Sequence, residues 1–163
     1  MTPELYRPVA TDRIGPEGLS VVVEATEAER IALAKRLGLP AVHALSCQFD
    51  LRGLPGETVA AAGYLSAQLA QVCVVSLDEF EAAVEERFVI HFVPQGRLSD
   101  DPDPGSPDEI PYSRGEIDLG EAAAEQLALA LDPYPRRPDA ALPEQGDKTA
   151  LHPFAALAAW RSH

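Results

Sequence analysis

The sequence is poor in positive charge. Lys and Arg number 13 against 26 Asp and Glu, which gives a formal net charge of −13. Nucleic-acid binding draws most of its affinity from cationic side chains that displace counterions from phosphate, so this balance argues against direct binding of bare RNA. The same negative field would attract a basic protein partner by long-range steering.

Cysteine and long apolar runs are also scarce. The only two cysteines, Cys47 and Cys73, lie far apart and have no metal-type spacing around them, so we expect buried thiols and neither disulfide framework nor metal site. No apolar run approaches the ~20 residues of a membrane-spanning helix. The start, Met1-Thr2-Pro3-Glu4, lacks the features of a secretory signal. These absences predict a cytoplasmic protein without cofactor, membrane segment or small-molecule substrate.

The 163 residues, of which 46% are apolar, suffice for one core, and we predict a single domain over residues 1–163. Alternating apolar residues over 19–25 indicate a strand. A helix follows, because Thr26 and Glu29 form a capping box, and Gly38 and Pro40 supply the stop after Ile31, Leu33 and Leu37.

Three longer segments show the two-residue period of half-buried strands. The second could also be read as helix, but Gly63 and the valines that follow favour strand. The third is expected to open with a short helical turn. Their predicted inward residues are His43, Leu45, Cys47, Phe49 and Leu51; Val59, Ala61, Gly63, Leu65, Ala67 and Leu69; and Phe80, Ala82, Val84, Phe88, Ile90 and Phe92.

The composition changes after the third segment. Residues 94–116, rich in Pro, Gly, Ser and Asp, predict a flexible acidic loop. Asp118 is placed to cap a second helix, with Glu121 at the capping-box position, and Pro133 ends that helix. Residues 133–152 read as an extended Pro-rich segment. A short closing helix with Phe154, Leu157 and Trp160 follows, docked either on its own sheet or in a partner's groove.

Long strands without intervening helices predict an α+β fold. We expect a twisted antiparallel or mixed sheet of about four strands, with two main helices packed on it and a short C-terminal helix.

Few residues suggest catalysis. Cys73 with His91 or His43 could form a nucleophile and base, but no nucleophile signature surrounds Cys73. Paired carboxylates such as Glu121 and Glu125 are common in so acidic a chain and fit a solvated helix face. We therefore predict no catalytic and no metal-binding residues.

Adjacent Arg136 and Arg137, next to Tyr134 and stiffened by prolines, form a plausible binding element, because a pre-organised extended segment loses little entropy on docking. The alternative is a local counterion for the acidic surface. Both interpretations remain open at this point.

Two stretches together resemble the YceD family, in particular its proteobacterial branch, in which the closing stretch Pro153–Leu157 also recurs. One runs from Gln71 to Phe88 and includes Cys73, Leu77 and Phe80; the other runs from Gly115 to Arg136 and includes Asp118, Leu119 and Glu121. The resemblance implies a non-enzymatic protein needed for accumulation of large-subunit (23S) ribosomal RNA. Many relatives carry Cys-x-Arg-Cys-Leu where this chain has Val75 and Ser76 after Cys73, so a thiol or metal role is not implied for this member.

Our leading hypothesis is an accessory factor of large-subunit assembly that docks on a basic ribosomal protein or an assembly intermediate, with any RNA contact indirect. The predicted contact residues are Glu125, Gln126, Tyr134, Arg136 and Arg137. The alternative is a general acidic adaptor unrelated to RNA that docks through the acidic loop, and a small Cys-His hydrolase comes third.

Overall fold

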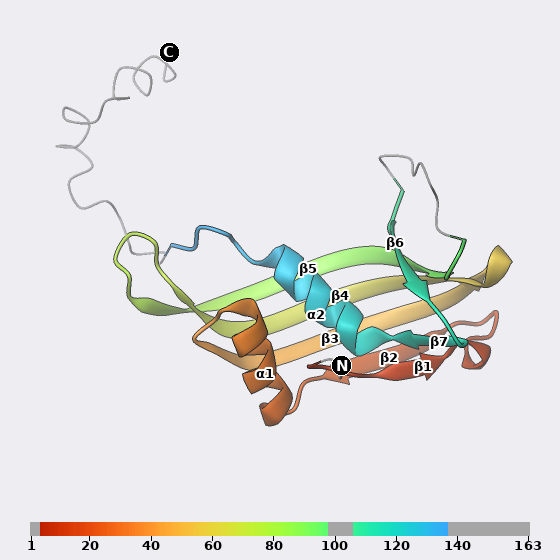
Figure 1. Ribbon diagram of the computed structural model, residues 1–163, viewed down its shortest axis with the longest axis horizontal. Coiled ribbons are helices and arrows are strands. Elements are labelled where there is room, and N and C mark those ends of the chain that lie inside the picture. Colours follow the sequence, from red (N-terminus) through yellow and green to blue (C-terminus); the bar gives the residue numbers. More distant parts are fainter. Residues whose placement is uncertain (1–3, 98–105, 137–163) are drawn as a thin grey trace, which may run out of the picture.

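The computed structural model describes residues 4–97 and 106–136 (Figure 1). Within them the chain forms an α+β fold, as predicted. Its elements are β1 (Pro8–Ala10), β2 (Leu19–Glu24), α1 (Glu27–Leu37), β3 (Ala41–Leu54), β4 (Thr58–Val72), β5 (Glu79–Pro94), β6 (Asp108–Tyr112), β7 (Glu116–Asp118) and α2 (Leu119–Ala130).

The main sheet has five strands in the order β2-β3-β4-β5-β6, and β1 pairs with β7 in a separate two-stranded sheet. All neighbours are antiparallel except β5 and β6, which are parallel. The sheet is therefore mixed, as expected, but the prediction of about four strands was too low. β6 lies inside the segment 94–116 that was predicted to be a loop, because a short strand with Pro111 and two acidic residues lacks an alternating apolar pattern.

The helix α1 begins and ends where the sequence predicted. The Thr26 hydroxyl accepts a hydrogen bond from the Glu29 backbone N–H, and the Glu29 carboxylate accepts one from the Thr26 N–H. Gly38 ends the helix in the left-handed region, with φ of 68°. The helix buries Leu33 and Ala34, whereas Ile31 is exposed.

The predicted buried face of β3 is confirmed from Leu45 to Leu51 but not at His43. A β-bulge between Val42 and Ala44 shifts the register, so that Val42 is buried and His43 is exposed. His43 Nε2 lies 2.8 Å from a carboxylate oxygen of Glu81 on the open face of the sheet.

β4 is a strand throughout, and β5 is a strand from Glu79 onward, so the helical turn predicted at its start was wrong. Gly63 has a packing role: a Cβ at this position would lie 2.2 Å from Cζ of Phe88. Its hydrogen side chain lets the Phe88 ring cross β4 and meet the Phe49 ring edge-on, with centroids 5.8 Å apart.

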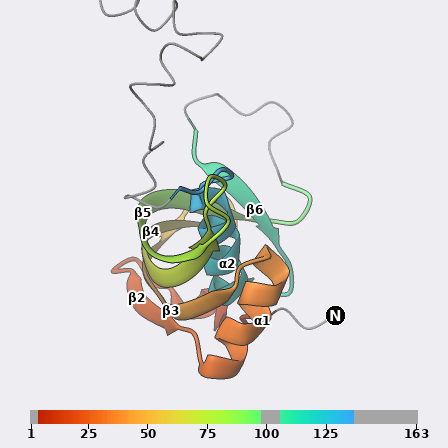
Figure 2. The same ribbon diagram turned by 90° about the vertical axis from the view of Figure 1, so that its left-hand side faces the viewer.

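Both helices lie on one face of the main sheet. α2 packs against β1, β2, β4 and β5, while α1 packs against β3. Figure 2 shows the sheet curving around α2. One apolar cluster joins these elements, and its largest fully buried side chains include Phe49, Phe92, Leu65, Leu69 and Leu127. In residues 4–97 and 106–136, no helix covers the opposite face of the sheet, which we call the open face.

Three expectations fall on residues outside the described ranges: most of the Pro-rich segment 133–152, the closing helix with Phe154, Leu157 and Trp160, and the side chain of Arg137. Among the helices in the described ranges, none combines the length and apolar character needed to cross a membrane.

Candidate functional site

The turn between β4 and β5 is a compact, hydrogen-bonded structure. The Cys73 N–H donates to the Asp78 carbonyl at 2.9 Å, and the Leu77 N–H donates to the Cys73 carbonyl at 2.8 Å. The Cys73 side chain is fully buried beneath the turn, and its Sγ accepts a 3.5 Å hydrogen bond from the Ser76 N–H. Ser76 therefore lies beside the Cys73 sulfur.

Leu77 occupies an unfavourable position in this turn. Its φ is +63°, in the left-handed region that costs an L-residue with a Cβ roughly 1–2 kcal/mol. Its side chain is also 76% exposed, the largest exposed fraction among the large apolar side chains in the described ranges. The chain thus holds a strained backbone and presents a bulky apolar side chain to solvent. Such strain persists only where the surrounding structure imposes it, and it is typical of functional sites.

The segment after α2 returns to this turn. Figure 1 shows it running from the end of α2 to the β4–β5 turn, and the Val74 N–H donates to the Pro135 carbonyl at 2.9 Å. The bond places Tyr134 and Arg136, two of the predicted contact residues, beside the turn. Tyr134 is 73% exposed and Arg136 is exposed as well.

These two segments form what we call the tip surface. Its side chains are apolar or aromatic and exposed, with one cation: Val74, Val75, Leu77, Tyr134 and Arg136. Exposed apolar side chains that gather in one place, unlike scattered ones, mark interaction sites. The sequence prediction named three of the five. It missed Val74 and Val75. The available signal was that these two valines directly precede the Ser-Leu-Asp turn and so lie outside the strand, where their side chains are exposed.

The other predicted contact residues lie elsewhere. Gln126 is 8% exposed on α2 and offers little surface to a partner. Glu125 lines an open hollow of about 670 Å³ between β6, β7 and α2, together with Glu116, Asp118 and Glu121. Partial burial, and next the Glu121 charge, raise the pKa of Glu125. The role of both residues in partner binding stays a prediction.

The family-motif residues at the start of α2, Asp118, Leu119 and Glu121, stabilise the fold. Oδ1 of Asp118 accepts hydrogen bonds from the N–H groups of Gly120 and Glu121, and also from the N–H of Arg7 at 2.9 Å. Leu119 is fully buried. The carboxylate of Glu121, expected to complete a capping box, instead binds Arg36 of α1, with the closest contact at 2.8 Å.

Arg7 ties this junction to α1. Its guanidinium donates two hydrogen bonds of 2.7 Å to the two carboxylate oxygens of Glu29. The hydrogen bonds from Arg7 lower the pKa of Glu29 to about 2. Gly120 allows the N-terminal segment to approach, because a Cβ there would lie 2.6 Å from the Leu5 carbonyl oxygen. This junction, formed by Leu5, Arg7, Arg36 and residues 118–121, is the second region in which motif residues gather.

The pair of Cys73 with His91 is excluded by the strand register. His91 pairs with Ala60 near one end of the β4–β5 ladder, whereas Cys73 follows Val72 at the other end, on the order of 40 Å away along the strand. His43 lies on the open face and faces Glu81, not the buried thiol. The second thiol, Cys47, is also buried, and burial raises its pKa to about 12.

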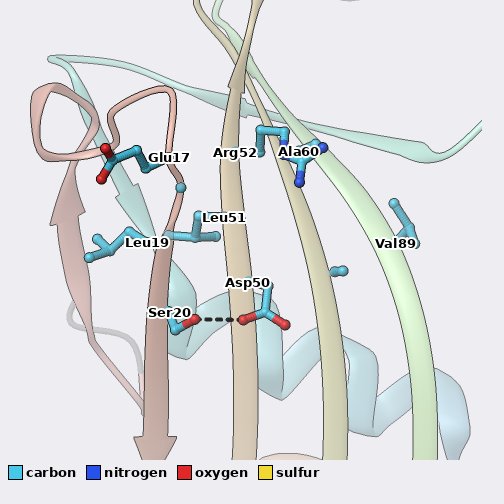
Figure 3. A pocket seen from close by; sticks show the side chains of 10 residues that line it. Glu17, Leu19, Ser20, Asp50, Leu51, Arg52, Ala60 and Val89 are labelled. Atoms are coloured by element: carbon cyan, nitrogen blue, oxygen red, sulfur yellow. Dashed lines mark hydrogen bonds between the residues drawn. The ribbon is translucent and has the colours of Figure 1, made fainter.

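The open face of the sheet carries a wide hollow of about 580 Å³ (Figure 3). It exists because alanines, Ala60 and Ala62, stand between longer side chains of β3 and β5. The Ser20 hydroxyl of β2 donates a 2.7 Å hydrogen bond to Asp50 of β3 on its floor. This surface mixes polar side chains with apolar ones such as Leu19 and Val89, and in this it differs from the mainly apolar tip surface.

The fold and the tip surface define a small α+β protein that carries exposed apolar side chains at one end of its sheet. Residues 61–159, more than half of the chain, match the family model described as "Large ribosomal RNA subunit accumulation protein YceD". The chain therefore belongs to the YceD family. No match was found among curated proteins or among solved structures.

Proposed function

We propose that this chain is a non-enzymatic accessory factor for accumulation of large-subunit ribosomal RNA, and that it acts in the cytoplasm by docking through the tip surface on a protein of the assembling subunit. The family description supports the link to large-subunit RNA. The docking mechanism is our inference from the site.

The observation that carries this proposal is Leu77, which is both strained and exposed. A turn that served stability alone would gain from glycine at this position, because glycine adopts positive φ without a Cβ clash. If Leu77 is an apolar anchor that becomes buried against a partner, this role explains why a leucine is held at the position. Such anchors contribute much of the binding energy of protein interfaces.

The net charge supports a protein partner over bare RNA. The chain has a formal net charge of −13, so it repels phosphate groups at long range and attracts a basic ribosomal protein. Arg136, the single cation of the tip surface, would pair with a carboxylate of that partner or with a nearby phosphate.

The test compares Leu77→Ala with Ile31→Ala in a tagged chain that replaces the native one. Ile31 is a matched control, because it is 64% exposed and lies on α1, outside the tip surface. Truncation of an interface anchor costs more than about 1 kcal/mol, or roughly fivefold in affinity. We expect Leu77→Ala to lower capture of large-subunit ribosomal proteins at least about fivefold and to lower large-subunit RNA, and Ile31→Ala to do neither.

Normal capture and normal RNA levels with Leu77→Ala would remove the tip surface from the proposal. Substitution of Arg136 and Arg137 together tests the cationic part, and unchanged growth with unchanged large-subunit RNA would show that these arginines serve only as local counterions. Capture of proteins unrelated to the ribosome, without ribosomal proteins or precursor RNA, would favour the general adaptor.

A further inference from the structure

The first half of β5 forms a long edge of the main sheet. β4 pairs with β5 from Glu79 to Phe92, but β6 pairs with it only from Ile90 to Pro94. In the part of the chain that the structure describes, no strand pairs with the outer side of residues 79–89. Figure 1 shows β6 beside only the end of β5 that is distant from the tip. Alternate residues of this edge therefore direct N–H and C=O groups away from the sheet.

The described residues after α2, 131–136, do not take up these groups. The Pro135 carbonyl accepts its backbone hydrogen bond from the Val74 N–H in the turn, ahead of the first residue of β5. A strand bound at the edge would therefore begin directly beside the tip surface.

The apolar side chains along this edge are incompletely covered. The inward residues Phe80, Ala82, Val84 and Phe88 are only half-buried, whereas Ile90 and Phe92, which β6 flanks, are buried. An added strand with apolar residues at alternate positions would continue the inward row and complete its burial.

The charged residues of the edge select the chemistry of that strand. Glu79, Glu81 and Glu85 are exposed on the open face, and Glu86, opposite Leu65, is exposed on the inward face. Arg87, which lies over the Tyr64 ring on the open face, is the one cation among residues 79–89, so the edge keeps an excess of negative charge. A second copy of this chain would bring two edges with an excess of carboxylates together, and like charges on neighbouring strands are destabilising. Basic side chains on an incoming strand would face these glutamates.

We propose that the edge formed by residues 79–89 binds an extended peptide segment of a partner, with basic residues alternating with apolar ones, by addition of a strand to β5. Main-chain hydrogen bonds would supply affinity in this mode, and the alternating side chains would supply specificity. The inference goes beyond the proposed function, because it names a second surface and the kind of segment that it takes.

The test uses the purified full chain and a synthetic peptide of alternating lysine and valine, about ten residues long to match the edge. We expect binding, together with slowed hydrogen exchange of backbone amides within residues 79–89. Two further peptides carry backbone N-methyl groups on either the lysines or the valines. Only one set of amides faces β5, so one of these peptides should bind at least about tenfold more weakly and the other nearly as well as the parent.

Three outcomes would overturn the proposal: no binding of the lysine-valine peptide, binding without slowed exchange in residues 79–89, or equal loss with both methylated peptides. Amides of residues 79–89 that are already protected in the chain alone, with no peptide bound, would show that the chain covers its own edge. An alternating glutamate-valine peptide serves as the charge control and should not bind.

A variant with Glu79→Gln, Glu81→Gln and Glu85→Gln tests the role of charge. Exposed ion pairs contribute roughly two- to fivefold each, so we expect binding of the lysine-valine peptide to weaken about tenfold or more. A control variant replaces Glu17, Glu24 and Glu27, which are exposed elsewhere, with glutamine and keeps the same net charge. If the variant with Glu79→Gln, Glu81→Gln and Glu85→Gln self-associates while the parent chain binds no peptide, the proposal is wrong. The glutamates then serve only to prevent pairing of the edge with another chain.

These outcomes separate the edge from the tip. Peptide binding by purified protein does not depend on Leu77, and loss of ribosomal capture with Leu77→Ala does not depend on the edge glutamates. Either proposal can therefore fail while the other stands.

Discussion

The junction at the start of α2 and the tip surface both contain residues of the family motif, but the two regions use them differently. At the junction, Asp118 and Glu121 bind Arg7 and Arg36, and Leu119 is buried. At the tip, only Cys73 is buried, while Leu77 is strained and exposed. The difference teaches that motif residues in this chain serve two purposes: those at the junction hold the N-terminal segment and the helices together, and Leu77 is available to a partner. Substitutions at the junction should therefore reduce stability, and those at the tip should reduce docking.

The largest expected effect is that of Gly120→Ala. The new Cβ would lie within 3 Å of backbone atoms of Leu5 and Arg7, which cannot move without displacing the N-terminal segment. Overpacking of this kind costs about 2–3 kcal/mol of unfolding free energy. Urea unfolding provides the measurement, and Gly15→Ala is the control, because a Cβ at Gly15 meets nothing within 4 Å. Equal stability of both variants would contradict the close approach at the junction.

Asp118→Ala should follow, with a loss of about 2 kcal/mol. Removal of the N-cap contributes about 1 kcal/mol, and the Arg7 N–H, part-buried, loses its acceptor. Asp118→Asn keeps an oxygen that accepts these bonds and should lose less than half as much. If thermal unfolding shows the two variants to be equally destabilised, the charge of Asp118 and not its capping bond is what matters.

The Arg7–Glu29 pair predicts an acid dependence of stability. Arg7 holds the pKa of Glu29 at about 2, below the ordinary value of 4.5 for this side chain, so the carboxylate stabilises the folded chain above pH 4.5. This contribution, about 1–2 kcal/mol for a pair that is partly exposed, is lost as the pH falls from 4.5 toward 2.

Glu29→Gln should therefore be less stable than the parent chain at pH 7, and the difference should shrink across that acid window. Urea unfolding from pH 7 down to pH 2 measures it, with Glu27→Gln in the same first turn as the control. A difference that is constant with pH would show that the ion pair adds nothing to the hydrogen bonds of the capping box.

The smallest change in stability, and the sharpest contrast between the two regions, is expected from Leu77→Gly. Relief of the positive φ should leave stability unchanged or raise it by up to about 1 kcal/mol, while capture of ribosomal proteins falls. Arg114→Gly is the matched control, because Arg114 also has positive φ, at 60°, and lies outside the tip surface. A loss of capture with both variants would show that backbone rigidity, and not the leucine side chain, is what a partner requires.

Part of the candidate site followed from the sequence. Tyr134 and Arg136 were predicted from a Pro-stiffened, cationic segment, and Leu77 from the family resemblance. Their meeting could not be predicted, because the Val74–Pro135 bond joins residues that are distant along the chain and carries no local signal. The burial of Gln126 was hidden for a related reason: helical spacing shows which residues share a face, but not how much of that face a neighbouring sheet covers.

What the sequence by itself determined is local. Thr26, Glu29, Gly38 and Asp118 set the ends of the helices through bonds to backbone groups a few residues away, and the two-residue period set the faces of β3 and β4. Only the tertiary structure decided the bulge that turns His43 outward, the parallel pairing of β6 with β5, and the tip surface. Each of these depends on a hydrogen-bonded partner far away in the chain, and the free energy of such a contact is set by where the rest of the fold brings its two sides together.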